Sequence, residues 1–210
     1  MELNLDQQVY NQLREMIFRY EIVPGQKLQY QDLADKLGVS RTPVKNALIF
    51  LERDGLVRLT PNKGFYVTEL SVKEAEELFE LREILEVEAA RLAVNRYTAE
   101  GLGDLVKKQE EYETMVEHEL TRGRFLIDRD FHLQVALMSG NRALCKHLKQ
   151  VLEITFLKHR IDRLSNKRGY EVRREHGKIV EAIRHRDEEG AVAGVRYHIQ
   201  RHRSNIISIL

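Results

Sequence analysis

The sequence has few of the features that cross-link a chain, anchor it in a membrane or interrupt its helices. Its one cysteine, Cys145, cannot form an internal disulfide and fits a reducing cytoplasm. No apolar run approaches the roughly 18 residues that a membrane span requires. No apolar segment follows Met1 as it would in a secretory signal. Only 3 prolines interrupt the 210 residues, which leaves room for long helices.

What is present suits a helix-rich chain with a sizeable core, because 42% of the residues are hydrophobic and 32% are charged. The net charge of +1 is unevenly spread: residues 1–70 carry a net charge of 0, residues 71–154 one of −5 and residues 155–210 one of +6. A nucleic-acid-binding protein needs a basic face rather than a basic total. Between positions 40 and 63, basic residues (Arg41, Lys45, Arg53, Arg58 and Lys63) outnumber acidic ones (Glu52 and Asp54).

Residues 40–48 have the pattern of a helix with one apolar and one polar side. Ser40 is a preferred N-cap residue, and Pro43 lies in the first turn, where proline is tolerated. Apolar residues recur at helical spacing behind it (Val44, Ala47, Leu48 and Leu51). The other side gathers hydrogen-bonding side chains (Arg41, Thr42, Lys45 and Asn46), which is the chemistry of a helix that enters a DNA major groove. An ordinary capped surface helix is the alternative.

The flanking segments favour DNA binding. Residues 5–20 and 30–37 are expected to be helices, and Gly38 ends the second just before Ser40. Two short helices joined by a glycine-containing turn make a helix-turn-helix. Residues 56–59 and 65–67 are then expected to form a β-hairpin, or wing, with Asn62, Lys63 and Gly64 at its tip.

These motifs resemble the winged helix-turn-helix of the GntR family of bacterial transcription regulators. The resemblance covers about 60 residues, from Val9 to Leu70, and includes Pro24-Gly25, Gly38-Val39-Ser40-Arg41-Thr42-Pro43-Val44 and Asp54-Gly55-Leu56-Val57. It implies binding to double-stranded operator DNA. This chain has Lys45-Asn46 where many relatives have Arg-Glu, and Gln31 where many have an arginine. We expect DNA contacts from the recognition helix and the wing, through Ser40, Arg41, Thr42, Pro43, Lys45, Asn46, Asn62, Lys63 and Gly64.

Beyond residue 70 the pattern is wholly helical. Ser71 and Glu74 form a capping-box pattern, which places a domain boundary between residues 1–70 and 71–210. Helical periodicity covers six segments: 72–96, 98–120, 122–139, 142–163, 170–186 and 188–208. The fold class is therefore mainly α, with an N-terminal winged helix-turn-helix followed by a six-helix antiparallel bundle.

Four ionisable residues fall on the apolar sides of these helices. Asp128 and His132 are four apart and leave the same face of one helix, while His176 and His198 lie on the apolar stripes of two others. A single histidine in such a place is usually a hydrogen-bonded core residue. One carboxylate and three imidazoles that point inward from three helices are harder to explain in this way, because buried ionisable groups are costly unless they are paired or metal-bound. Imidazole suits Zn, Ni, Cu or Fe.

The same four residues are similar to those of the helical domain in the FadR-type branch of the GntR family, in the shorter, VanR-like variant. That resemblance implies a divalent metal held by Asp128, His132, His176 and His198, a small effector that is often a carboxylic acid, and a homodimer. His202, one turn beyond His198, is a reserve ligand or a packing group. Arg82 is a candidate partner for the acid, with a surface ion pair to Glu86 as its alternative.

The chain is therefore expected to be a ligand-responsive transcription regulator, most often a repressor in such families, and not an enzyme. One alternative keeps the DNA-binding domain but makes the metal itself the signal, or purely structural. A second alternative is a helical-bundle metalloenzyme in which the same four residues activate water. That reading leaves the winged helix unexplained.

Overall fold

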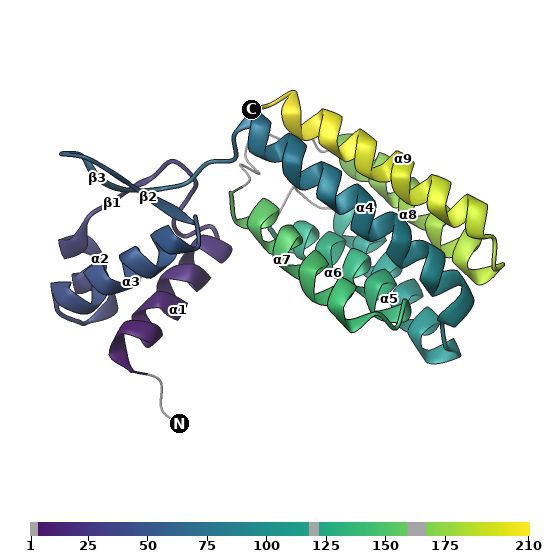
Figure 1. The fold of residues 1–210 in the computed structure, drawn as a ribbon, viewed down its shortest axis with the longest axis horizontal. Coiled ribbons are helices and arrows are strands. Elements are labelled where there is room, and N and C mark those ends of the chain that lie inside the picture. The colour runs from purple at the N-terminus through teal and green to yellow at the C-terminus, as the bar shows by residue number, and fades with distance from the viewer. Residues whose placement is uncertain (1–3, 118–121, 159–166) are drawn as a thin grey trace. The chain divides into compact units, whose positions relative to one another are not determined.

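The computed structural model describes residues 4–117, 122–158 and 167–210, and within these ranges the chain forms nine helices and three short strands (Figure 1). Contacts divide them into two compact units, which are described one at a time. The first holds the chain up to Leu70 together with the end of helix α7 from Phe156; the second holds the remainder. The mainly helical class predicted from sequence is confirmed.

The first unit consists of three helices and a small sheet. Helices α1 (Leu5–Phe18), α2 (Tyr30–Leu37) and α3 (Arg41–Arg53) bury the apolar positions of their amphipathic stripes, with Val9, Val44, Leu48 and Leu51 fully buried. Gly38 ends α2 in the left-handed conformation (φ 66°), in which glycine is unstrained. The turn between α2 and α3 is therefore the tight connection that the sequence predicts.

Strands β2 (Val57–Thr60) and β3 (Gly64–Val67) form the expected hairpin, in which Arg58 faces Tyr66. A third strand, β1 (Lys27–Leu28), pairs antiparallel with β3, so the strand order is β1-β3-β2. The sequence analysis missed β1, because two residues are too short to show a period. Pairing with β1 gives the wing a third strand for support.

The second unit contains six long helices. They are α4 (Val72–Arg96), α5 (Ala99–Val116), α6 (Arg122–Met138), α7 (Arg142–Lys158), α8 (Lys167–Arg184) and α9 (Glu188–Ile207). The Ser71 hydroxyl accepts a hydrogen bond from Glu74 N (3.2 Å) at the start of α4. The predicted segments 98–120 and 142–163 extend into residues outside the described ranges. Residues 167–169 also belong to α8, which therefore begins three residues before the predicted segment 170–186.

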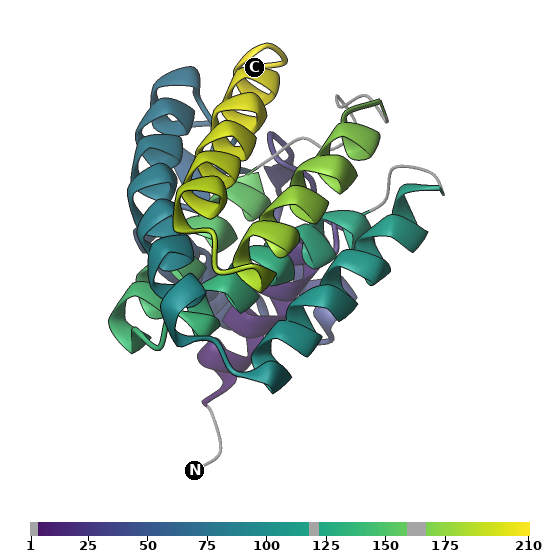
Figure 2. The same cartoon turned by 90° about the vertical axis from the view of Figure 1, so that its right-hand side faces the viewer.

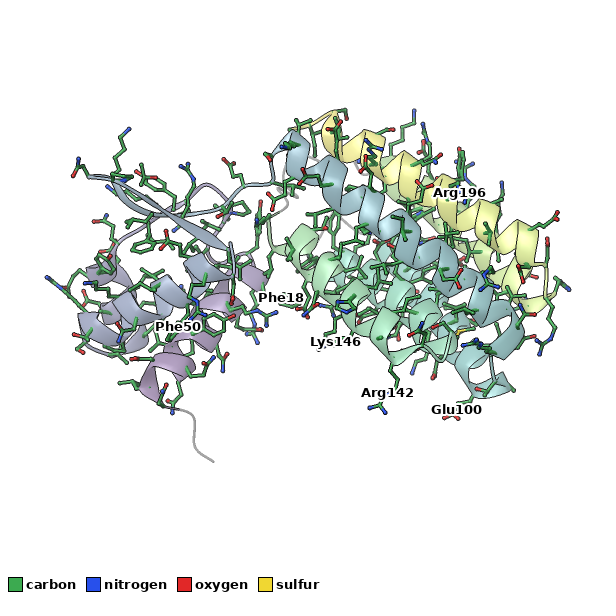
Figure 3. All side chains as sticks on the ribbon, in the orientation of Figure 1. Phe18, Phe50, Glu100, Arg142, Lys146 and Arg196 are labelled. Atoms are coloured by element: carbon green, nitrogen blue, oxygen red, sulfur yellow. The ribbon has the colours of Figure 1, made fainter. Side chains whose placement is uncertain are left out.

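Five of these helices form a closed ring. α4 packs on α9, α9 on α8, α8 on α5, α5 on α6, and α6 on α4 (Figure 2). Charged side chains such as Glu100, Arg142 and Arg196 project from the outer surface of the bundle (Figure 3). Arg196 on α9 pairs with Glu83 on α4 at 3.2 Å, which joins two neighbours of the ring. The ring encloses a core that is largely apolar but includes a group of buried polar side chains.

Candidate DNA-binding surface and metal centre

The recognition helix α3 presents most of its predicted DNA-contacting residues to solvent. Ser40, Arg41, Thr42 and Lys45 are exposed. Ser40 precedes the helix in an extended conformation, yet its side chain makes no capping hydrogen bond, contrary to the expectation from sequence. The physical reason lies at the third helical position. An N-cap side chain usually bonds the second or third backbone N–H, and Pro43 has none to offer.

Two of the predicted contact residues already have partners within the protein. Pro43 is buried, which corrects its assignment as a DNA contact: it packs in the core of the unit. Asn46 is half-buried and donates a hydrogen bond from Nδ2 to Asp6 on α1 (2.9 Å). Its amide oxygen is consequently directed away from the carboxylate. Fewer side chains of α3 are therefore available for DNA contacts than the sequence suggested.

Arg41 is also oriented by a neighbouring helix. Its Nε donates a hydrogen bond to the side-chain oxygen of Gln31 on α2, and Gln31 Nε2 donates to Asp35 (2.6 Å). The two terminal nitrogens of the guanidinium are the donors that bond the edge of a guanine. Gln31 thus contacts the arginine expected to read bases.

The wing tip is built by backbone geometry. Asn62 has a positive φ of 61° and Gly64 one of 95°, while Lys63 N donates to Thr60 O (3.0 Å). Asparagine and glycine are the residues that adopt such angles most readily. Asn62 and Lys63 are both exposed. A lysine at such a tip can pair with a DNA phosphate.

In the second unit the four predicted metal ligands lie together inside the helix ring. Asp128 and His132 come from α6, His176 from α8 and His198 from α9, and their ligand atoms all lie within 4.8 Å of one another. The three histidines are buried, with exposed fractions of 3%, 0% and 0%. His202 contributes no atom to this group of four; its ring lies 6.0 Å from that of His198 and 5.4 Å from Phe79, centroid to centroid.

The inward-facing nitrogens of these imidazoles lack hydrogen-bond partners. Nε2 of His132, His176 and His198 is buried and has no hydrogen-bond partner within the described residues. The nearest carboxylate is that of Asp128, at 3.8 Å from His132 Nε2 and 3.5 Å from His176 Nε2. Such groups are costly to bury unless something bonds them. Three convergent imidazole nitrogens and one carboxylate match the donor set of a transition metal.

Two of the histidines are held on their other nitrogen by a carboxylate. His132 Nδ1 lies 2.6 Å from Glu86 on α4, and His198 Nδ1 lies 2.7 Å from Glu175 on α8. A carboxylate on Nδ1 fixes the tautomer in which Nε2 is the free electron-pair donor, and it raises the basicity of that donor. His176 differs, because neither of its ring nitrogens has a hydrogen-bond partner among the described residues.

An arginine neutralises each of these carboxylates. Arg82 Nε donates to Glu86 at 2.7 Å, and Arg168 bonds both oxygens of Glu175, at 2.6 and 2.7 Å. Burial alone would raise the pKa of Glu86, but the charges and hydrogen bonds of Arg82 and His132 outweigh it and lower the pKa to about 2. Burial would likewise raise the pKa of Glu175, and its hydrogen bonds lower it to about 2. Both carboxylates are therefore ionised at neutral pH.

Burial also lowers the pKa of His176 and of His198, so both imidazoles are neutral at pH 7. Neutral imidazole is the form that binds metals. For His176 the neighbouring histidines act in the same direction. The neutral state of these two imidazoles thus suits metal coordination.

Arg82 is not where the sequence analysis expected it. It is buried (2% exposed), it bonds Glu86, and its guanidinium lies 5.0 Å from the centroid of the Phe79 ring. The ion pair with Glu86 exists, but in the core rather than on the surface. Arg82 therefore supports His132 through Glu86. The arginines that line a cavity beside the cluster are Arg124 and Arg168 instead.

Sequence reasoning did not identify Glu86 and Glu175 as partners of the histidines. A signal was available for Glu86, since it continues the buried stripe of α4 formed with Phe79, Arg82 and Ala89. Glu175 gives the same kind of signal, since it lies three residues after Val172 and four before Ile179 on the buried stripe of α8. Within the described residues, no helix is long and apolar enough to cross a membrane.

Comparisons with known proteins agree with both units. Residues 5–67 match the family described as "Bacterial regulatory proteins, gntR family", and residues 77–201 match the FCD domain. The chain is 32% identical over 193 residues to the HTH-type transcriptional regulator YdhC of Bacillus subtilis, covering 91% of this chain and 86% of that protein. It is also 32% identical over 199 residues to the Nta operon transcriptional regulator of Aminobacter aminovorans, covering 93% and 91%.

Solved structures share the fold. E. coli McbR/YncC has a TM-score of 0.80 at 24% identity and covers 99% of both chains. A GntR regulator from Rhodococcus sp. RHA1 has a TM-score of 0.79 at 19% identity and covers 98% of both. The relatives are transcription regulators, so the metalloenzyme alternative is set aside. This chain belongs to the GntR family of bacterial regulatory proteins and is a DNA-binding transcription regulator whose helical domain is an FCD effector domain.

Proposed function

We propose that the FCD domain binds a divalent transition metal through Asp128, His132, His176 and His198, together with a small carboxylate effector, and that this binding controls the affinity of a homodimer for its operator. The observation that carries the proposal is the set of three buried Nε2 atoms that converge with a carboxylate and have no hydrogen-bond partner within the described residues. Zinc and nickel are the foremost candidates for the ion.

The residues around the metal position would have separate roles. Glu86 and Glu175 orient two imidazoles and keep their Nε2 atoms available, while Arg82 and Arg168 hold these carboxylates ionised in a buried place. A divalent ion held by four protein ligands can accept a further oxygen ligand, which an effector carboxylate would supply. The cavity that adjoins Asp128 is small, about 30 Å³, and would have to widen to admit such a molecule.

At the DNA, two copies of helix α3 would read half-sites about one helical turn apart on a near-palindromic operator. The exposed Arg41, Thr42 and Lys45 would contact bases and phosphates from α3, and Asn62 and Lys63 would do so from the wing. An effector that favours one arrangement of the dimer changes how well both copies fit. We propose repression as the sign of regulation.

The experiment is operator binding by the full chain in three states: treated with chelator, loaded with zinc, and loaded with zinc plus an organic acid. The proposal predicts that a change in operator affinity requires both the metal and the acid. A change with the metal alone would support the alternative in which the metal is the signal. If operator affinity is the same in all three states, the metal has a purely structural role.

A variant tests the ligand set directly. His176→Ala removes one donor and should lower the metal content measured by elemental analysis. Exposed His185, which directly follows the last residue of the same helix and pairs with Glu181, is a matched control. His185→Ala should leave the metal content unchanged. Equal metal content in the two variants would remove His176 from the site.

A further inference from the structure

His176 is the one candidate ligand histidine whose Nδ1 has no hydrogen-bond partner in the described part of the chain. Its Nε2 lies 3.5 Å from Asp128 and is the nitrogen that faces the metal position. An imidazole that binds an ion through Nε2 carries its hydrogen on Nδ1. The side chain is fully buried, so this N–H needs an acceptor from a neighbouring residue.

Gln109 on α5 has the complementary gap. Its side chain is 7% exposed, and its Oε1 is buried without a hydrogen-bond partner among the described residues. Its Nε2 donates to Arg173 O on α8 and to the Glu113 side chain, both at 2.9 Å. A backbone carbonyl and a carboxylate can only accept, so they fix which end of the amide is the nitrogen. Gln109 therefore presents an acceptor on its other side.

The amide of Gln109 lies against the turn of α8 that carries His176. Arg173, whose carbonyl it contacts, precedes His176 by three residues. A Cβ atom at Gly177, the residue after His176, would lie 3.8 Å from Gln109 Nε2. Tyr112, one turn further along α5, has its ring 5.1 Å from that of His176, centroid to centroid. An unpaired donor and an unpaired acceptor thus lie on neighbouring helices, and burying both in that state is costly.

The other two histidines show what such a partner does. Each is held at Nδ1 by a carboxylate that an arginine neutralises. Gln109 is backed in a similar way by Glu113, which pairs with Arg173 at 3.3 Å. An amide oxygen carries no charge, so it can accept the Nδ1 hydrogen without a neutralising arginine in the core.

We propose that Gln109 is the positioning residue of His176. Its Oε1 accepts a hydrogen bond from His176 Nδ1–H, directly or through one water molecule, and so keeps Nε2 available as the electron-pair donor. This inference rests on the proposed function, because it concerns the same metal position. It gives α5 a role in orienting a ligand, alongside α4 and α8, which orient the other two.

Zinc affinity of the full-length protein, measured by competition with a chromophoric chelator, gives the first test. Gln109→Leu keeps a similar volume but removes the acceptor, so zinc affinity should fall about tenfold. The matched control is Gln134→Leu. Gln134 is half-buried on α6 and donates to Gly101 O at 3.0 Å, so this change also removes a bond between two ring helices, yet zinc affinity should stay the same. Equal affinity in Gln109→Leu and the unaltered protein would overturn the proposal.

A double-mutant cycle separates positioning from folding. If Gln109 acts through His176, Gln109→Leu should lower zinc affinity in the unaltered protein but not in a His176→Ala background. A tenfold loss in both backgrounds would show that Gln109 acts by another route and would overturn the proposal while the metal site stands. If the unaltered protein takes up no zinc, the proposed function fails, and this inference fails with it.

Proton and nitrogen-15 NMR of the zinc-loaded protein observes the contact itself. The Nδ1–H signal of His176 is identified by its loss in His176→Ala. It should be protected from exchange with solvent, and Gln109→Leu should shift it while the signals of His132 and His198 stay in place. A signal that does not shift would exclude Gln109 as the acceptor, whatever the zinc affinities.

Discussion

Glu175 holds His198 at 2.7 Å through Nδ1 and is itself held by both terminal nitrogens of Arg168. The imidazole therefore cannot turn its ring without breaking a charged hydrogen bond. A metal ligand restrained in this way keeps its donor atom pointed at the ion. The restraint comes from a residue that touches no ion, and its contribution can be measured separately.

The first prediction follows from that contact. Glu175→Gln weakens the hold on His198 and removes a negative charge near the ion, so metal affinity should fall roughly 10- to 100-fold. Competition with a chromophoric chelator measures this affinity. Glu181→Gln, a change at an exposed residue on the same helix, serves as the control. Equal zinc affinity in the two variants would show that Glu175 plays no part in metal binding.

The second prediction concerns the stability of the bundle. Arg82→Ala leaves the Glu86 carboxylate buried without its arginine, and breaking such a pair costs about 3–5 kcal/mol of unfolding free energy. Urea denaturation of metal-free protein measures the loss. Arg91→Ala breaks the exposed pair of Arg91 with Glu88 on the same helix and should change stability little. Losses of similar size in both variants would contradict a special role for the buried pair.

The third prediction concerns base reading by α3. Arg41→Ala should cost roughly 1–3 kcal/mol of operator affinity and relax base choice. Gln31→Ala leaves the Arg41 side chain in place and removes the hydrogen bond that orients it, along with the exposed bond from Gln31 to Asp35. It should therefore cost less, about 0.5–1.5 kcal/mol, and relax the same base position. Binding to an operator library measures both effects.

Lys63→Ala at the wing tip provides the contrast. A lost phosphate contact weakens binding to all sequences alike and reduces the slope of log affinity against log salt by about 1. If Gln31→Ala behaved like Lys63→Ala, without any change in base preference, Gln31 would not be a positioning residue.

The fourth prediction isolates backbone conformation. At both Gly38 and Gly103 an added Cβ would meet no atom within 4 Å, but only Gly38 has a positive φ, 66°. Gly38→Ala should therefore destabilise the first unit by about 1–2 kcal/mol. Gly103→Ala, in the interior of α5, should stabilise the second unit by about 0.5–1 kcal/mol. Thermal unfolding of the two variants should show shifts of opposite sign.

Much of this structure can be predicted from sequence, because local signals such as helix caps and apolar periodicity are sufficient for it. Helix α4 was predicted at 72–96 and spans Val72–Arg96, since Ser71 provides a cap and the apolar stripe runs through the whole segment. The four candidate ligands could be found because each interrupts an apolar stripe. Periodicity locates such positions without knowledge of tertiary contacts.

The parts that sequence missed depend on partners far along the chain. Glu86 meets His132 from another helix; its place on the buried stripe of α4 indicates burial, but no local pattern identifies His132 as its partner. Arg168 falls between the predicted helical segments 142–163 and 170–186, because residues 165–169 lack apolar periodicity. Its significance emerges only when α8 brings it beside Glu175 and the cavity.

Phe131 lies parallel to His176, with ring centroids 3.9 Å apart and planes 8° apart. A stacked ring at van der Waals distance lets the imidazole shift within its own plane but not tilt out of it. His176 is thus held by ring stacking on Phe131, whereas His132 and His198 are held by carboxylates at Nδ1. Substitutions that remove the Glu86 and Glu175 carboxylates would therefore loosen those two rings and leave the stacking of His176 on Phe131 intact. The metal ligands would then lose their fixed orientation at His132 and His198 but not at His176.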